Sequence, residues 1–171
     1  MRVLVLLLLI SPWSWSEQQT GLPTEIQPLK WTEKRLHRLN LRIEKATRKK
    51  QWKLAILLGE ENLDGCLELY NEKNPRCISI MKNNSIAYFH SGKSEQYSEH
   101  IARAYQLAST HLGVQHFSTI ITRDIYHRLL MSQVRYEEAI PLVIELIEVE
   151  KIQSNDVFKI LDLEILLYAL Y

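Results

Sequence analysis

Apolar side chains recur every third or fourth residue from Trp31 onward, in segments separated by short polar turns. This spacing places them on one face of an α-helix, so each segment predicts an amphipathic helix. The chain has only five Gly and five Pro, too few for a turn-rich β-sandwich or a Gly-rich nucleotide site. With no convincing strand pattern, we expect an all-α fold of antiparallel helical hairpins.

Turn residues divide this region into a basic leading helix at residues 30–50 and a helical repeat domain at residues 51–171. The helices of that domain are expected at residues 51–70, 77–90, 94–112, 117–133, 135–151 and 155–171. Asn155 is expected to cap the last helix, because an Asn side chain can accept the free N–H groups of a first turn.

Three of these helices begin alike, which suggests an internal repeat. An aromatic residue stands second and an apolar residue sixth in the segments 51–56, 96–101 and 135–140. Two-helix units of this kind bury their apolar faces by stacking on one another. We expect the three aromatic residues to fill the space between helices: Trp52, Tyr97 and Tyr136.

Three short motifs resemble the tetratricopeptide repeat, most closely the longer form found in kinesin light chains. Asn84-Ser85-Ile86-Ala87 resembles its asparagine-leucine-alanine motif. Tyr136-Glu137-Glu138-Ala139 resembles the end of its glycine-x-tyrosine-x-x-alanine motif, and Leu112-Gly113-Val114-Gln115-His116 its leucine-glycine-x-x-histidine motif. The chain departs from the family at the glycine, which is replaced by Lys50, Glu95 and Arg135.

The resemblance covers residues 48–171 and implies about three repeats, stacked into a curved α-solenoid. In this family the concave face, lined mainly by the first helix of each pair, holds a peptide or a partner helix. Here it implies a binding face on the helices at 51–70, 94–112 and 135–151. Candidate residues on that face are Glu60, Arg103 and Glu145.

Residues 1–16 have the layout of a secretory signal peptide. Arg2 gives a positive start, Val3–Ile10 is an aliphatic run, and Ser14 and Ser16 precede a cleavage site before Glu17. The run is shorter than the roughly 20 residues that span a bilayer. We therefore expect a periplasmic or secreted protein with no transmembrane segment in the mature chain, the alternative being an uncleaved anchor. Residues 17–29 are polar and are expected to form a flexible leader.

Export would place Cys66 and Cys77 in a compartment that permits disulfides. Either they bridge two antiparallel helices around a bend at Asn71–Pro75, or they remain free thiols in the core. A zinc site is disfavoured, because neither has a companion Cys or His pair.

Known catalytic motifs are absent from the sequence, including Gly-x-Ser-x-Gly, the P-loop, His-Glu-x-x-His and Cys-x-x-Cys. Asp124 and His127 are close enough in sequence to touch on a helix, and we interpret them as a surface pair. We therefore expect no enzyme and no cofactor.

The net charge of +1 conceals an uneven distribution of charge. Residues 17–53 carry ten Lys and Arg against four acids, whereas residues 54–171 carry ten against sixteen. The basic part is either a solvated helix face or a docking surface for an acidic partner. The candidate docking residues are Lys34, Arg35, Arg38, Arg42, Lys45 and Lys49.

The leading hypothesis is an exported protein–protein interaction module that binds a peptide or a partner helix without catalysis. The alternative is a periplasmic sensory or assembly factor that associates with an anionic membrane surface through its basic helix. Nucleic acid is disfavoured by export and by the acidic later half. The apolar stretch at 160–171 is expected either to pack back on the repeats or to dock a partner or a second copy, giving a homodimer.

Overall fold

The computed structural model describes residues 30–154 and 156–171. The chain divides into two units, Met1–Lys30 and Trp31–Tyr171, and all the described helices belong to the second. The predicted signal peptide at 1–16 and leader at 17–29 lie outside the described residues.

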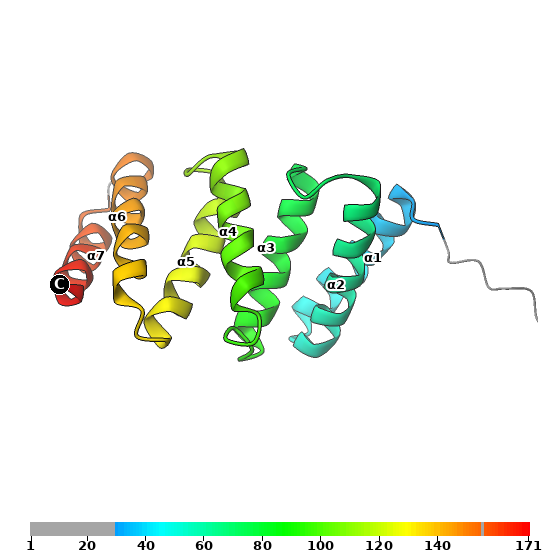
Figure 1. Cartoon of the computed structure of the whole chain (residues 1–171), viewed down its shortest axis with the longest axis horizontal. Coiled ribbons are helices and arrows are strands. Elements are labelled where there is room, and N and C mark those ends of the chain that lie inside the picture. The colour runs from blue at the N-terminus through cyan, green and yellow to red at the C-terminus, as the bar shows by residue number, and fades with distance from the viewer. Residues whose placement is uncertain (1–29, 155) are drawn as a thin grey trace, which may run out of the picture. The chain divides into compact units, whose positions relative to one another are not determined.

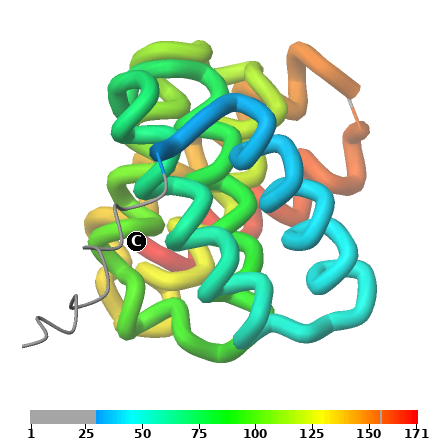
Figure 2. The backbone as a smooth tube through the Cα atoms, turned by 90° about the vertical axis from the view of Figure 1, so that its right-hand side faces the viewer, coloured from blue at the N-terminus to red at the C-terminus, as the bar shows by residue number. Residues whose placement is uncertain are grey.

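The described residues form seven α-helices and no strand, which confirms the all-α, repeat-like fold (Figure 1). The helices are α1 (Glu33–Arg48), α2 (Trp52–Leu69), α3 (Pro75–His90), α4 (Ser98–Leu112), α5 (Phe117–Ser132), α6 (Tyr136–Gln153) and α7 (Val157–Leu170). Each helix packs against the next, and α3 also packs directly against α5. Figure 2 looks at this unit from its α1 end, with α1 and α2 in front of the later helices.

Helices α1, α3 and α5 repeat at a constant interval. They begin at positions 33, 75 and 117 and end at positions 48, 90 and 132, so the second step equals the first. We call this step the repeat period. The residue before each helix caps it, as Thr32, Asn74 and His116 accept first-turn N–H groups at 3.2, 2.9 and 3.1 Å. A side chain that accepts such an N–H group fixes where the helix begins.

The turn that ends each of these helices repeats as well. Lys50, Gly92 and Val134 have positive φ angles of 54°, 71° and 59°. The next N–H then bonds to the carbonyl five residues back, as from Gln51 to Ala46 at 2.9 Å, and the other two turns make the same bond. This is a Schellman motif, which reverses the chain into the following helix at a fixed angle.

These turns correct the alignment expected from the sequence. The sequence pairs Lys50 with Glu95 and Arg135, but the left-handed backbone position falls at Gly92 and Val134. Tyr97 does not mark the start of a helix in the way that Trp52 and Tyr136 do, because residues 94–97 form a turn and α4 begins only at Ser98. Aligning the repeats on Tyr97 therefore gives the wrong positions. The turns therefore mark the repeat period along the odd-numbered helices, from α1 to α3 to α5.

Two further local expectations are also corrected. The N-cap of α7 is Asp156, whose carboxylate accepts from Phe158 N at 3.1 Å and from Lys159 N at 3.2 Å, while Asn155, expected to cap this helix, lies outside the described residues. Of the three aromatic residues expected between helices, Trp52 stacks on His90 and Tyr97 on Tyr88. The third, Tyr136, is instead 41% exposed.

Two glycines let other groups approach α2 closely. A Cβ atom on Gly59 would overlap Asn84 Oδ1, and one on Gly65 would overlap the Trp31 ring. These positions therefore require glycine for α3 and Trp31 to pack as they do.

The interior of the later repeats contains a buried ionic cluster. Arg123 of α5 is fully buried, and its Nη2 donates to Glu145 Oε1 of α6 at 3.0 Å and to Val114 O at 2.6 Å. Tyr105 of α4 donates to the other oxygen of Glu145 at 2.6 Å. Burial, and then this hydrogen bond, raises the pKa of Tyr105 to about 12, so it remains a donor at ordinary pH. The cluster ties three helices together.

The expected surface pair of Asp124 and His127 does not form. Asp124 pairs with Arg128 at 3.0 Å, while His127 is buried. Burial is also the main reason why the pKa of His127 is lowered.

Replacing Glu145 with Ala leaves Arg123 buried without its counter-ion, which costs about 3–5 kcal/mol of unfolding free energy. The matched change Glu138→Ala, which breaks the exposed pair with Arg135 at 2.7 Å, costs roughly 0–1 kcal/mol. Urea unfolding of both variants measures the difference, and equal losses would contradict this role for the buried cluster.

Candidate functional site

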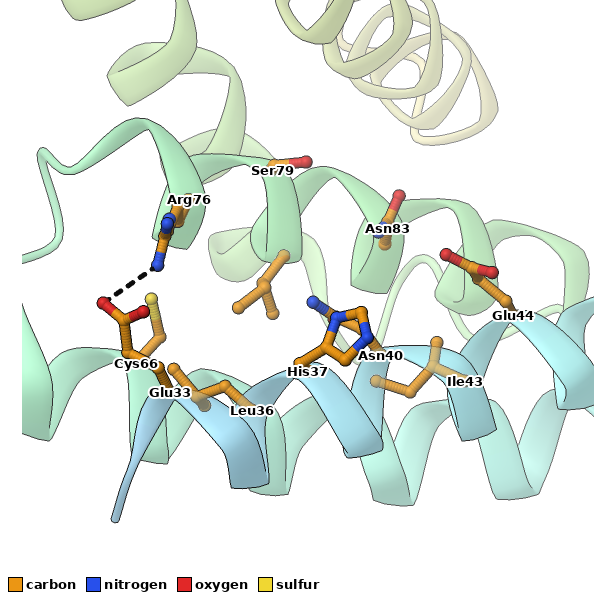
Figure 3. Close-up of a pocket in the computed structure, with 11 residues that line it drawn as sticks. Glu33, Leu36, His37, Asn40, Ile43, Glu44, Cys66, Arg76, Ser79 and Asn83 are labelled. Atoms are coloured by element: carbon orange, nitrogen blue, oxygen red, sulfur yellow. Dashed lines mark ion pairs between the residues drawn. The ribbon is translucent and has the colours of Figure 1, made fainter.

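A groove of about 530 Å³ runs between α1 and α3, over α2, which packs against both (Figure 3). Buried apolar side chains line its floor: Leu36, Ile43, Cys66 and Ile80. The two flanking helices run in the same direction, as the labelled residues from Glu33 to Glu44 on α1 and from Arg76 to Asn83 on α3 show (Figure 3).

Polar side chains line the groove from both sides. Helix α1 contributes Glu33, His37, Asn40 and Glu44, and α3 contributes Arg76, Ser79 and Asn83. The buried Asn62 donates its Nδ2 to Asn40 Oδ1 at 2.6 Å. This bond orients the Asn40 carboxamide and leaves the Nδ2 group of Asn40 as a donor. The groove thus combines an apolar floor with carboxamide, hydroxyl, imidazole and carboxylate groups.

At one end of the groove an ion pair joins α3 to α1. Arg76 Nη1 lies 3.3 Å from Glu33 Oε1, and the same nitrogen donates to the Tyr70 hydroxyl at 3.1 Å. Tyr70 in turn donates to Glu33. That hydrogen bond, followed by the charge of Arg76, lowers the pKa of Glu33 below its usual range. The charges at this end are therefore largely paired with one another.

At its other end the groove continues as a depression of about 230 Å³. Thr47, Arg48 and Ile86 line this part, together with Ile43, Glu44 and Asn83, which it shares with the main groove. The full groove follows α1 over its 16 residues, a length of about 24 Å at the helical rise.

The repeat period explains why a groove lies here. Ile86, Ile121 and Ile125 belong to the hydrophobic cluster where α3 packs against α5. The equivalent positions, one repeat period earlier, hold Glu44, Ser79 and Asn83. Polar groups are costly to bury without partners, so these positions keep α1 and α3 from closing together as α3 and α5 do.

Cys66 of α2 and Cys77 of α3 form a disulfide, with their Cα atoms 5.7 Å apart and both side chains fully buried. Of the two alternatives left open by the sequence, the structure contains the bridge around the Asn71–Pro75 bend. A cross-link closing a loop of this length stabilises a fold by about 3 kcal/mol. It holds the α2–α3 hairpin that forms the floor and one side of the groove.

The expected basic residues lie mostly on one exposed face of α1. Their spacing of three or four residues aligns Lys34, Arg38, Arg42, Lys45 and Lys49, and we call this set the basic stripe. Within the described chain none of the five forms an ion pair with an acid. Arg35 lies apart, because it stacks over Trp31 and pairs with Glu61 at 3.0 Å.

A second depression, of about 600 Å³, lies along α4 and is bounded by Tyr126 of α5. Among the residues expected to bind on the even-numbered helices, Arg103 lines this depression and pairs with Glu72. Glu145 instead forms an ion pair with Arg123, and Glu60 is half-buried. Of these three residues, Arg103 lines the depression, and Glu145 contacts Tyr105, which lines it too.

The α1–α3 groove is not among the sites expected from the sequence. In the sequence, the groove corresponds to polar residues at positions where the next repeat has isoleucine. This difference can be seen only when the repeats are aligned at the correct residues, an alignment that we call the repeat frame. An alignment on the aromatic residues shifts that frame and hides the difference.

No protein-family model and no curated protein matches this chain. No helix among residues 30–154 and 156–171 has the length and apolar character needed to cross a membrane. The same residues contain no group of three or more His, Cys, Asp or Glu side chains placed to hold a metal ion.

Proposed function

We propose that this chain is an exported protein-interaction module of the tetratricopeptide type, which binds an extended peptide segment of a partner protein between α1 and α3. The observation that carries this proposal is the polar groove, at positions where the next repeat uses isoleucine to pack its helices. The constant repeat period and the repeated turns support the resemblance to the kinesin-light-chain type of repeat.

An extended peptide suits the groove because its backbone offers a donor and an acceptor at every residue. Asn40 on α1 and Asn83 on α3 can meet these groups from opposite sides. Alternate side chains of the peptide would point to the apolar floor. At about 3.3 Å per residue, the roughly 24 Å groove accommodates about seven residues.

The groove contains a serine and a histidine but lacks the arrangement of a hydrolase. In the described chain Ser79 and His37 make no hydrogen bond with one another, and Ser79 Oγ points away from the imidazole (Figure 3). A serine without an adjacent base is a weak nucleophile. This supports binding without catalysis.

Two features support export. Residues 1–16 carry the pattern of a signal peptide. The chain also holds a buried disulfide, and such bonds persist mainly in oxidising compartments. Mass analysis of the product from an oxidising host would report cleavage before Glu17.

Peptides selected from a random display library on the purified, oxidised chain should bind in the groove. Ser79→Trp fills the groove and should weaken their binding about tenfold or more, equivalent to at least ~1.4 kcal/mol. Ser109→Trp is the matched control, because Ser109 is a half-buried residue on α4, away from the groove. The Ser109→Trp variant should bind the selected peptides with unchanged affinity.

A second variant tests the same site without a bulky ring. Glu44→Ile, Ser79→Ile and Asn83→Ile together copy the α3–α5 contact, and should abolish peptide binding without lowering the thermal unfolding midpoint. Failure to enrich any peptide, or equal binding by all variants, would overturn the proposed function.

The basic stripe supports a second candidate, association with an anionic membrane surface. Lys34→Gln with Lys45→Gln should reduce sedimentation with phosphatidylserine vesicles, and 1 M salt should abolish it because the screening length falls to about 3 Å. Lys73→Gln with Lys93→Gln, which removes the same charge elsewhere, is the control. Absence of vesicle binding at low salt would exclude this candidate.

A further inference from the structure

Helix α7 has two apolar faces, and only one of them is used within the unit. Its inner face packs Ile160, Leu163 and Leu167 against Val143 and Ile147 of α6. Its outer face exposes Phe158 by 82%, Leu161 by 50%, Ile165 by 59% and Tyr168 by 86%. We call these four residues the outer stripe. Isolated exposed apolar residues are common, but a contiguous row of this size marks an interaction site.

The outer stripe has the spacing of a helix–helix seam. Its residues follow one another at intervals of three, four and three, which keeps them on the side that faces a partner helix. Their order is also symmetric, with an aromatic residue at each end and two aliphatic residues in the middle. A second copy of the helix in the opposite direction presents the matching surface, because Phe158 then meets Tyr168 and Leu161 meets Ile165.

The charges on α7 leave this seam accessible. Lys159 pairs with Glu150, and Glu164 pairs with Lys151 at 3.1 Å, so both are held by α6. Asp162 is the remaining charged residue of the helix and flanks the outer stripe. No charged side chain interrupts the four apolar positions.

The exposed area fits a small homodimer. With about 150–250 Å² for a whole aromatic side chain, the exposed parts of the outer stripe amount to on the order of 500 Å² per copy. Val157 and Tyr171, exposed by 68% and 86%, extend the patch at its two ends. A specific interface buries about 800 Å² on each partner, so the patch is close to the size that a reversible dimer needs.

We propose that two copies of this chain associate through α7, as an antiparallel helix pair about a twofold axis between Leu161 and Ile165. Isologous contact of this kind uses the same patch on both copies and leaves no second patch unpaired. The α1–α3 groove lies on other helices, so each dimer would carry two peptide sites. The inference does not depend on what the groove binds.

Sedimentation equilibrium of the whole chain from an oxidising host tests the dimer. The native chain should show a concentration-dependent monomer–dimer equilibrium. Ile165→Glu should raise the dissociation constant by about a hundredfold or more, because it buries two unpaired carboxylates at the seam. Ile152→Glu is the matched control, since Ile152 is 66% exposed on α6 outside the outer stripe and should leave the equilibrium unchanged.

Cysteine cross-linking tests the direction of the pair. A mixture of Phe158→Cys and Tyr168→Cys chains should form mixed disulfide dimers in preference to either like pair. Circular dichroism of each variant should retain the native helix content. A chain that stays monomeric at every concentration, or a dimer that Ile165→Glu leaves intact, would overturn the proposal. Preferential like-pair cross-links would overturn the antiparallel arrangement.

Discussion

Every two-helix unit in this chain depends on its neighbours to bury its apolar side chains. The Schellman turns at Lys50, Gly92 and Val134 set the direction of each even-numbered helix relative to the helix before it. Because the turns recur once in every repeat period, each helix packs against the next along the unit. The ion pair between buried Arg123 and half-buried Glu145, and the Cys66–Cys77 disulfide, add specific links between helices.

The candidate site arises from a local departure from that regularity. One repeat later, Ile86, Ile121 and Ile125 join α3 to α5, whereas polar residues at the equivalent positions keep a groove between α1 and α3. The disulfide and the contact of Glu33 with Arg76 hold the sides of this groove in place. A repeat architecture can therefore create a binding site by exchanging a few packing residues while the turns and helices stay the same.

Helix positions were predictable from the sequence because a helical period of apolar residues survives in every segment. The alignment of the repeats was not predictable from the sequence. Lys50 and Val134 adopt a left-handed backbone that their side chains do not favour, and Tyr97 matches the aromatic position of a helix start although it lies in a turn. The burial of Arg123 was also unpredictable, because its partners Val114 and Glu145 come together only in the fold. The cysteine bridge was foreseen as one of two alternatives, and the basic stripe as a set of residues, while the groove was missed.

The central functional claim is that peptide binding occurs between α1 and α3. A crystal structure of the chain with a library-selected peptide would test it most directly. We expect an extended peptide along the groove, with its backbone hydrogen-bonded to Asn40 and Asn83 and side chains directed to Ile43 and Ile80. A peptide bound on the faces of α2, α4 and α6, or folded as a helix outside the groove, would contradict the account.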